Sequence, residues 1–225
     1  SKGLEDDTLK TLSAVIAEEL PRNPVVMLSG PSHAEEVARG CATTVVAASR
    51  PRTAAERVQD ILMNETFRIY TSDDVLGIEL GGAVKNVIAL AAGVLDGLGA
   101  GDNTKAALMT RGITEIARLG TAMGARFETF GGLSGIGYLI VTCTSMHSRN
   151  RRCGILLGQG LSLPEAMQQV GQAVEGVNAT TCAYELSRRL GVEMPITRQI
   201  YRTLKGELTP AESLGELLGR PQRHE

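Results

Sequence analysis

The stretch LGIELGGAVKNVIALAAGVLDGL, residues 76–98, is the most apolar segment of the chain and decides its fold. It carries Glu79, Lys85 and Asp96 among aliphatic side chains. Those charges argue against a membrane span, because ionised groups are costly in lipid. A helix that is apolar on every side is typical of one enclosed by others. We therefore predict a buried central helix here, and no membrane span.

Downstream of this stretch the apolar residues recur at helical spacing and strand patterns stop. An all-α part is therefore expected from about residue 73 to residue 225. Its further helices are predicted at 104–124, 148–157, 163–170, 179–190, 196–204 and 210–218.

Upstream, helix and strand patterns alternate, which predicts an α/β layer with a largely parallel sheet over residues 1–72. Strands are expected at 24–28, 42–48 and 67–71, and helices at 6–20, 33–39 and 51–63. No G-x-G-x-x-G follows a strand, and a doubly wound domain needs such a unit to hold a pyrophosphate. We expect the chain to begin in the middle of a dinucleotide-binding domain, with that unit ahead of Ser1.

Composition excludes several classes of function. The 23 basic and 25 acidic residues leave a net charge of −2, which argues against nucleic-acid binding. The polar opening of the chain does not resemble a signal peptide. Four scattered cysteines without a C-x-x-C pair indicate buried thiols in a reducing compartment, and the histidines lack metal-ligand spacing, so no metal is expected.

Lys85 is the first candidate for chemistry. Gly81 and Gly82 lie one turn before it on the same helix face, and glycines in a helix cost about 1 kcal/mol each. A ligand that approaches the lysine would explain them, and so would close helix packing around a snorkelling lysine. The pattern leaves both open. A desolvated lysine exchanges protons near neutral pH.

The segment LIVTCTSMHSRNRR, residues 139–152, is the second candidate. Arginines crowd a predicted helix start at Ser148, and their planar forks match phosphate oxygens. Arg149 and Asn150 are therefore expected to bind an anion. A solvated basic helix face is the alternative.

Two weaker patterns complete the set. Ser32 and Glu35 form an S-x-x-E capping box after a strand, which predicts a helix N-terminus at a ligand edge or simply a cap. Glu175 joins two predicted helices and by itself indicates only an exposed side chain.

Taken together, these segments resemble the bacterial NAD(P)-dependent glycerol-3-phosphate dehydrogenase family along the whole chain. The resemblance implies a partial Rossmann-like sheet followed by a helical substrate domain of the 6-phosphogluconate dehydrogenase C-terminal type. It also implies reduction of dihydroxyacetone phosphate to sn-glycerol 3-phosphate for phospholipid synthesis, with NAD or NADP, in a cytoplasmic homodimer. Matching strings include SKGLE, LSGPSHAEEVARG, GIELGGAVKNVIALAAGVLDGLG, LIVTCTSMHSRNRR and VEGVNATTCAYELS.

The resemblance also assigns roles to single residues. Lys85 is similar to the family's proton donor and acceptor, and Lys2 to a second lysine at substrate and nicotinamide. The remaining substrate positions are Gly30, Ser32, Thr142, Ser148, Arg149 and Asn150, and the remaining cofactor positions are Ala34, Arg149, Ala173 and Glu175.

Tyr138 departs from the family pattern, which has an acidic residue between Gly137 and Leu139. A tyrosine is bulkier and neutral at pH 7, so it is expected to fill part of the substrate site and to remove a charge that keeps the lysine protonated. Two other interpretations stay open. One is a dehydrogenase of the same architecture with another substrate, and the other is a non-catalytic binding or assembly protein.

Overall fold

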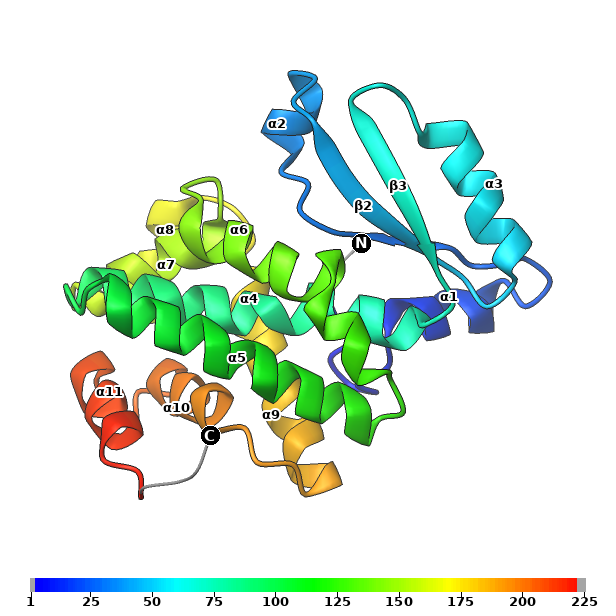
Figure 1. Cartoon of the computed structure of the whole chain (residues 1–225). Helices are drawn as coiled ribbons and strands as arrows, with labels where there is room; N and C mark the ends of the chain where they lie inside the picture. The colour runs from blue at the N-terminus through cyan, green and yellow to red at the C-terminus, as the bar shows by residue number, and fades with distance from the viewer. Residues whose placement is uncertain (1–2, 222–225) are drawn as a thin grey trace.

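The computed structural model describes residues 3–221, with a small sheet on one side and a helical body around α4 on the other (Figure 1). The amino-terminal elements are α1 (Leu12–Glu19), β1 (Met27–Ser29), α2 (Ala34–Ala38), β2 (Thr43–Ala48), α3 (Arg52–Leu62) and β3 (Phe67–Ser72). The helical body contains α4 (Val75–Gly97), α5 (Asp102–Ala122), α6 (Tyr138–Thr144), α7 (Arg149–Gly158), α8 (Leu163–Val170), α9 (Glu175–Leu190), α10 (Pro195–Leu204) and α11 (Pro210–Leu218). Two short turns of helix, η1 (Phe127–Gly131) and η2 (Leu133–Gly137), precede α6.

The sheet confirms the α/β class but is mixed. β2 and β3 are parallel, with Val45 opposite Ile69, whereas β1 is antiparallel to β2, with Met27 opposite Ala48. The expectation of a largely parallel sheet is thus wrong for β1. Residues 30–42 join β1 to β2 and contain only the five-residue α2, not the long crossover helix that usually links parallel neighbours. So short a helix favours the antiparallel pairing.

Side chains that alternate along β2 fill two separate cores. Val45 and Ala47 pack with Ile69 beneath α3, while Val46 and Ala48 pack with Ile78 at the start of α4. The sheet is therefore fixed directly on the amino-terminal end of α4, and this contact sets where the β1–α2 loop lies relative to the helical body.

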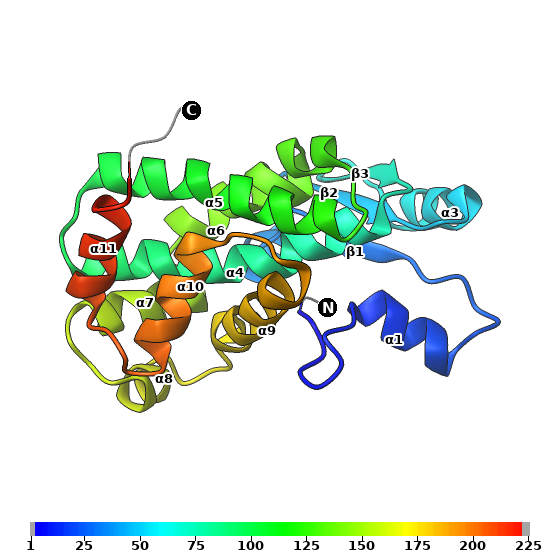
Figure 2. The same cartoon turned by 90° about the horizontal axis from the view of Figure 1, so that it is seen from below.

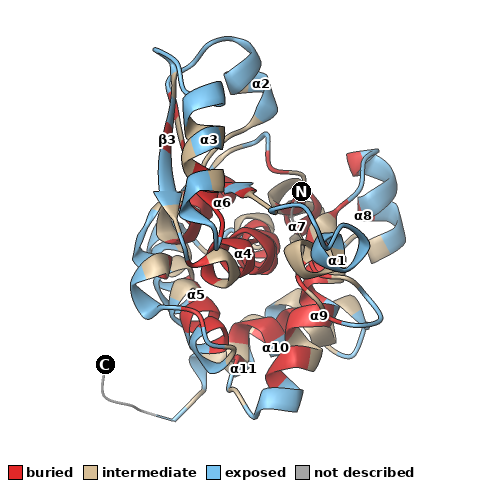
Figure 3. Ribbon diagram, turned by 90° about the vertical axis from the view of Figure 1, so that its right-hand side faces the viewer, coloured by how far each residue is buried: buried red, intermediate tan, exposed pale blue. Residues whose placement is uncertain are grey.

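Helix α4 is the buried centre that the sequence predicts (Figure 3). By length and composition it is apolar enough to cross a membrane, yet 89% of its most apolar window is buried in the fold. Gly93 faces the Arg151 carbonyl of α7, and Gly154 of α7 faces the Leu90 carbonyl of α4. A methyl group at either glycine would collide with backbone, so the two helices pack at backbone contact.

Helix α1 has no buried residue and lies to the side of the helices around α4, near the end that carries the sheet (Figure 2). The buried carboxylate of Glu79 on α4 accepts a hydrogen bond from the Ser13 amide at 2.8 Å and another from its hydroxyl. Leu4 and Leu9 join the core around α4. Helix α1 is shorter than the predicted 6–20 because Asp6 to Thr8 form a turn.

Helix boundaries otherwise follow the predictions closely. Helices α8 and α11 match at both ends, and Asp74 caps α4 by accepting a hydrogen bond from the Gly77 amide at 3.0 Å. Helix α9 begins at Glu175, four residues before the predicted start at 179. The segment η1–η2–α6 was not predicted as helical, because its glycines obscure the periodicity.

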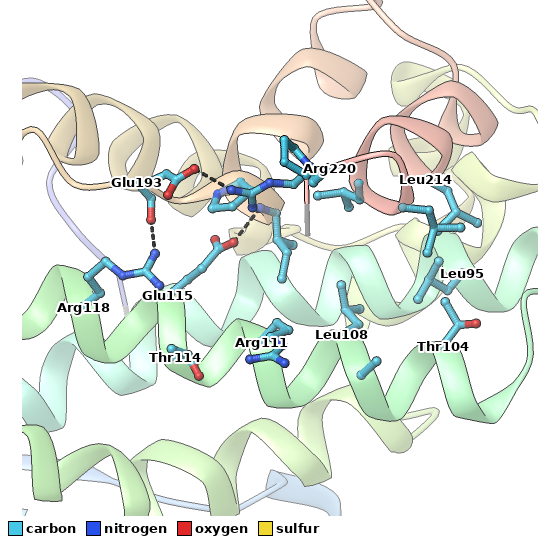
Figure 4. Close-up of a pocket in the computed structure, with 16 residues that line it drawn as sticks. Leu95, Thr104, Leu108, Arg111, Thr114, Glu115, Arg118, Glu193, Leu214 and Arg220 are labelled. Carbon is cyan, nitrogen blue, oxygen red and sulfur yellow. Dashed lines mark hydrogen bonds and ion pairs between the residues drawn. The ribbon is translucent and has the colours of Figure 1, made fainter. Parts of the chain in front are cut away.

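A cavity of about 500 Å³ opens between α5, α10 and α11, and Glu115 lies at its wall (Figure 4). The Glu115 carboxylate accepts hydrogen bonds from the Ile196 amide at 2.6 Å and from the Thr197 amide and hydroxyl at 3.2 Å each. It therefore caps the first turn of α10 from a neighbouring helix.

Burial raises the pKa of Glu115 to about 7, against the hydrogen bonds from Ile196 and Thr197, which lower it. The folded chain therefore holds a proton that the unfolded chain releases at lower pH. We expect the free energy of unfolding to fall by about 3 kcal/mol as pH rises from about 4.5 to about 7, since each pKa unit corresponds to about 1.4 kcal/mol.

Urea unfolding at pH 5 and pH 8 measures this change, and Glu115→Gln is the control because it is neutral at both. The wild type should lose more stability between the two pH values than the variant does. An identical loss in both proteins would assign the pH dependence to other groups.

Candidate functional site

Lys85 lies in the middle of α4 and is 2% exposed, which confirms the predicted position. Its ammonium donates a hydrogen bond to Asn86 Oδ1 at 2.8 Å. The ring of Tyr138, at the start of α6, has its centroid 4.1 Å from the Lys85 Nζ atom. A buried lysine is thus held among polar and aromatic groups, instead of snorkelling to solvent.

Close packing explains the two glycines before Lys85. A Cβ at Gly81 would lie 2.5 Å from the Ser134 carbonyl oxygen, and one at Gly82 would lie 2.9 Å from Ser29 Oγ. Helix α4 therefore meets the η2 turn and the end of β1 at these positions. Of the two alternatives, packing is the one the structure shows, although the contact is with a turn and a strand end and not with another helix.

Asn86 is the centre of a hydrogen-bonded network around the lysine. Its Oδ1 accepts from Lys85 and also from Asn150 Nδ2 at 2.9 Å, while its Nδ2 donates to Glu175 Oε2 at 3.3 Å. Asn150 Oδ1 accepts from the Gly176 amide at 2.8 Å, in the first turn of α9. The network joins α4, α7 and α9, and it leaves Asn150 one amide hydrogen for a ligand.

Sequence reasoning did not single out Asn86 as a site residue. The available signal was an amide in an otherwise apolar helix, since a buried amide needs hydrogen-bond partners. Glu175 was likewise interpreted from its pattern as merely exposed. Its side chain is 39% exposed and contacts Asn86, so that interpretation was wrong.

The arginines after Ser148 have different surroundings. Ser148 caps α7 as predicted, accepting from the Arg151 amide at 3.2 Å. Arg151 binds Asp96 at 2.7 Å, which fixes α7 on the end of α4. Arg149 instead lies at the edge of the network, 3.8 Å from Glu175 and 39% exposed. Of these two cations, Arg149 has the exposure that anion binding requires, and it adjoins Asn150.

The β1–α2 loop brings a second segment to this region. The ring of His33 lies 5.7 Å from the ring of His147, which precedes Ser148. Gly30 is buried with φ of +140°, and a Cβ there would lie 2.9 Å from the Val45 Cα atom, so only glycine fits.

The predicted capping box in this loop does not form. Ser32 Oγ donates to the Gly30 carbonyl at 3.0 Å, and the helix begins after His33 without a side-chain cap. Because β1 is antiparallel, its end also lies away from the carboxyl ends of β2 and β3. The S-x-x-E pattern is therefore not a cap here, although the start of α2 does follow the carboxyl end of β1 as predicted.

The other predicted positions are distributed around the network. Thr142 is 3% exposed and donates to the Tyr138 carbonyl at 2.6 Å, so its hydroxyl serves α6. Ala34 lies exposed at the start of α2, and Ala173 lies exposed just before α9. Lys2 lies outside the described residues.

A buried hydroxyl lies at the end of β1, where the strand meets α4. Ser29 Oγ is buried and has no hydrogen-bond partner within residues 3–221, and it lies beside Gly82 and before Gly30. Polar groups in such positions need a partner. Ser29 Oγ therefore has hydrogen-bonding capacity that a bound molecule at this end of β1 could use.

Thiols near the site are inert. Cys143, Cys153 and Cys182 are buried as expected, whereas Cys41 is exposed. Burial raises the pKa of Cys143 to about 12, so this thiol beside the lysine is neutral.

Comparison with known proteins gives a consistent result. Residues 74–215 match the family model described as NAD-dependent glycerol-3-phosphate dehydrogenase C-terminus, and residues 1–55 match the corresponding N-terminus model. Glycerol-3-phosphate dehydrogenase [NAD(P)+] of Clostridium acetobutylicum is 56% identical over all 225 residues, which cover 68% of that protein. The Moorella thermoacetica protein of the same name is 58% identical over 226 aligned residues, and the match covers 67% of it.

Solved structures of glycerol-3-phosphate dehydrogenases have the same fold as this chain. A crystal structure of glycerol-3-phosphate dehydrogenase from Coxiella burnetii has a TM-score of 0.94 at 43% identity, covering 97% of this chain and 67% of that one. The enzyme from Saccharomyces cerevisiae has a TM-score of 0.86 at 26% identity, covering 97% of this chain and 66% of that one.

Proposed function

Because the chain belongs to the NAD-dependent glycerol-3-phosphate dehydrogenase family, we propose that its residues form the substrate half of an enzyme that reduces dihydroxyacetone phosphate to sn-glycerol 3-phosphate. The observation that carries this proposal is the buried Lys85 ammonium, held by Asn86, with Arg149 at the open edge of the same network. The comparisons favour this substrate over that of another dehydrogenase of similar architecture. The relatives named above give no support to the alternative of a non-catalytic binding or assembly protein.

Lys85 is proposed as the general acid. Reduction of a ketone develops negative charge on the carbonyl oxygen, and a fixed ammonium stabilises that charge and donates a proton to the oxygen. Asn86 holds the ammonium and is itself held by Asn150 and Glu175. In the reverse direction the neutral amine of Lys85 takes the hydroxyl proton.

The phosphate is proposed to bind at the start of α7. Arg149 supplies a planar pair of donors, and Asn150 has one amide hydrogen left after its bonds to Asn86 and Gly176. Ser148 contributes by capping this helix turn. Lys2, Gly30, Ser32 and Thr142 remain proposed substrate positions from the family match.

NAD or NADP is the cofactor of the family, and when bound it supplies the hydride. Within this chain we propose that Ser29 and Gly30 line the nicotinamide side, and that Arg149 and Glu175 border it. Ala34, Ala173 and Lys2 are the other proposed cofactor positions.

We further propose two units, 1–72 from the dinucleotide-binding domain and 73–225 as the helical substrate domain, which forms a homodimer in the cytoplasm. The domain division is supported by the sheet ending at Ser72 and the helical body beginning with α4. Dimerisation is supported by large apolar side chains left exposed on the helical part, such as Phe127 at 64%. Three buried free thiols suit a reducing compartment.

Thermal protection tests the phosphate site. At about 100 times its Kd, glycerol 3-phosphate contributes about 2.7 kcal/mol, which should raise Tm by roughly 5 °C or more. Glycerol, which lacks the phosphate, should have no effect. We expect Arg149→Ala to abolish the rise, because it removes the exposed fork donor.

Arg189→Ala is the matched control, since it removes an exposed arginine at the far end of α9. It should keep full protection. Equal protection in the wild type and in Arg149→Ala would reject this phosphate site.

A further inference from the structure

The ring of Tyr138 lies against the catalytic candidate. Tyr138 is 2% exposed, and its ring centroid is 4.1 Å from Lys85 Nζ. A cation within about 6 Å of a ring centroid is attracted by the negative face of the ring, and the attraction grows when both groups are shielded from water.

The other ring contacts of cations in the described part of the chain are weaker. Arg68 lies 5.2 Å from the ring of Tyr70, which is 48% exposed, and Lys205 lies 5.6 Å from the ring of Tyr201. The Lys85–Tyr138 pair is therefore both the shortest and the most buried of the three.

The backbone before Tyr138 fixes the ring in place. The η2 turn has an irregular backbone at Gly135, which packs against the Phe130 backbone so closely that a Cβ would not fit. The Tyr138 carbonyl then accepts the Thr142 hydroxyl at 2.6 Å, which stabilises the first turn of α6.

The remaining groups around Lys85 are neutral or more distant. Cys143 on α6 is a neutral thiol, and Asn86 on α4 offers an amide oxygen. The Glu175 carboxylate of α9 accepts a hydrogen bond from Asn86 and is also 3.8 Å from Arg149 of α7. Glu79, further back on α4, is bonded to Ser13. The ring face and the Asn86 amide oxygen are thus both in direct contact with the ammonium and both present negative potential to it.

We propose that Tyr138 is a positioning residue for Lys85, and that its ring face, not its hydroxyl, keeps the ammonium charged and aimed into the site. The catalytic meaning of this inference rests on the proposed function, since a general acid must hold its proton until the substrate oxygen needs it. The physical interaction itself does not depend on turnover.

The negative potential of the ring face can be varied by fluorination while the volume of the side chain stays nearly constant. We would replace Tyr138 by phenylalanine and by its mono-, di- and trifluorinated analogues, which weaken the negative face stepwise. The pKa of Lys85 is measured by ¹³C NMR of its Cε atom in the whole chain, assigned by its loss in Lys85→Arg.

Tyr138→Phe should leave the pKa of Lys85 within about 0.3 unit of wild type, because the ring face remains. The trifluorinated ring should lower this pKa by about one unit, a tenfold weaker hold on the proton, and the intermediate analogues should fall between. Tyr201→Leu, which removes the partner of Lys205, should leave the Lys85 pKa unchanged.

A flat fluorination series would overturn the proposal. So would a fall in the Lys85 pKa in Tyr138→Phe as large as that in the trifluorinated protein, because the hydroxyl would then be responsible. The titration uses neither substrate nor cofactor, whereas the proposed function is tested by glycerol 3-phosphate protection, so the two failures are distinguishable.

Discussion

A polypeptide of these 225 residues should bind NADH and NADPH too weakly for measurable reduction of dihydroxyacetone phosphate. The chain contains no G-x-G-x-x-G, so it offers no helix N-terminus with close backbone approach for the pyrophosphate. Without those contacts the hydride donor is not held at the carbonyl. Positioning accounts for about 7–11 kcal/mol of a barrier, so we expect turnover at least about 10⁴-fold below that of a protein with the fingerprint unit.

A chimaera provides the comparison. The part of the Clostridium acetobutylicum relative that lies outside the match would be placed ahead of Ser1. Oxidation of NADPH would be followed by its absorbance, beside calorimetric titration of the cofactor. The chimaera should recover both binding and turnover. Rapid turnover by the 225 residues alone would refute this account of cofactor binding.

In the same chimaera, Lys85→Met should reduce kcat by about 10²–10⁴-fold, the range typical of losing a general acid. Methionine has a similar length and fills the buried position, so folding should be retained. Asn86 Oδ1 keeps its bond from Asn150, which preserves the network. KM for dihydroxyacetone phosphate should change little, because Arg149 is untouched.

Lys105→Met is the matched control for this measurement. Lys105 lies on α5 and pairs with Asp96 at 2.6 Å, so its loss removes a lysine charge without touching the Lys85 network. It should leave kcat within a few-fold of wild type. If Lys85→Met retained most of the activity, another group would have to supply the proton.

The structure changes the interpretation of Tyr138, the residue that departs from the family pattern. From the sequence it is a lost negative charge and added bulk. The structure shows the ring face against the ammonium, so part of the lost electrostatic support is replaced. Tyr138→Asp is therefore expected to change the turnover of the chimaera less than the addition of the amino-terminal unit or Lys85→Met does.

The sequence by itself determined most of the elements, though not η1, η2 and α6, and it determined the candidate lysine. Apolar periodicity is a local property, which is why the buried α4, the helix start at Ser148 and the change from alternating strands and helices to helices alone could all be predicted. Lys85 stood out for the same reason, as a charge within an apolar helix.

Only the tertiary structure decided which groups meet. Asn86, Asn150 and Glu175 lie far apart in the chain and are joined by hydrogen bonds that depend on α4, α7 and α9 packing at backbone distance. The direction of β1 is likewise set by its pairing with β2, and in the folded loop the Ser32 hydroxyl bonds the Gly30 carbonyl instead of capping α2. Local patterns do not encode such contacts, because the free energy that selects them comes from packing between segments remote in sequence.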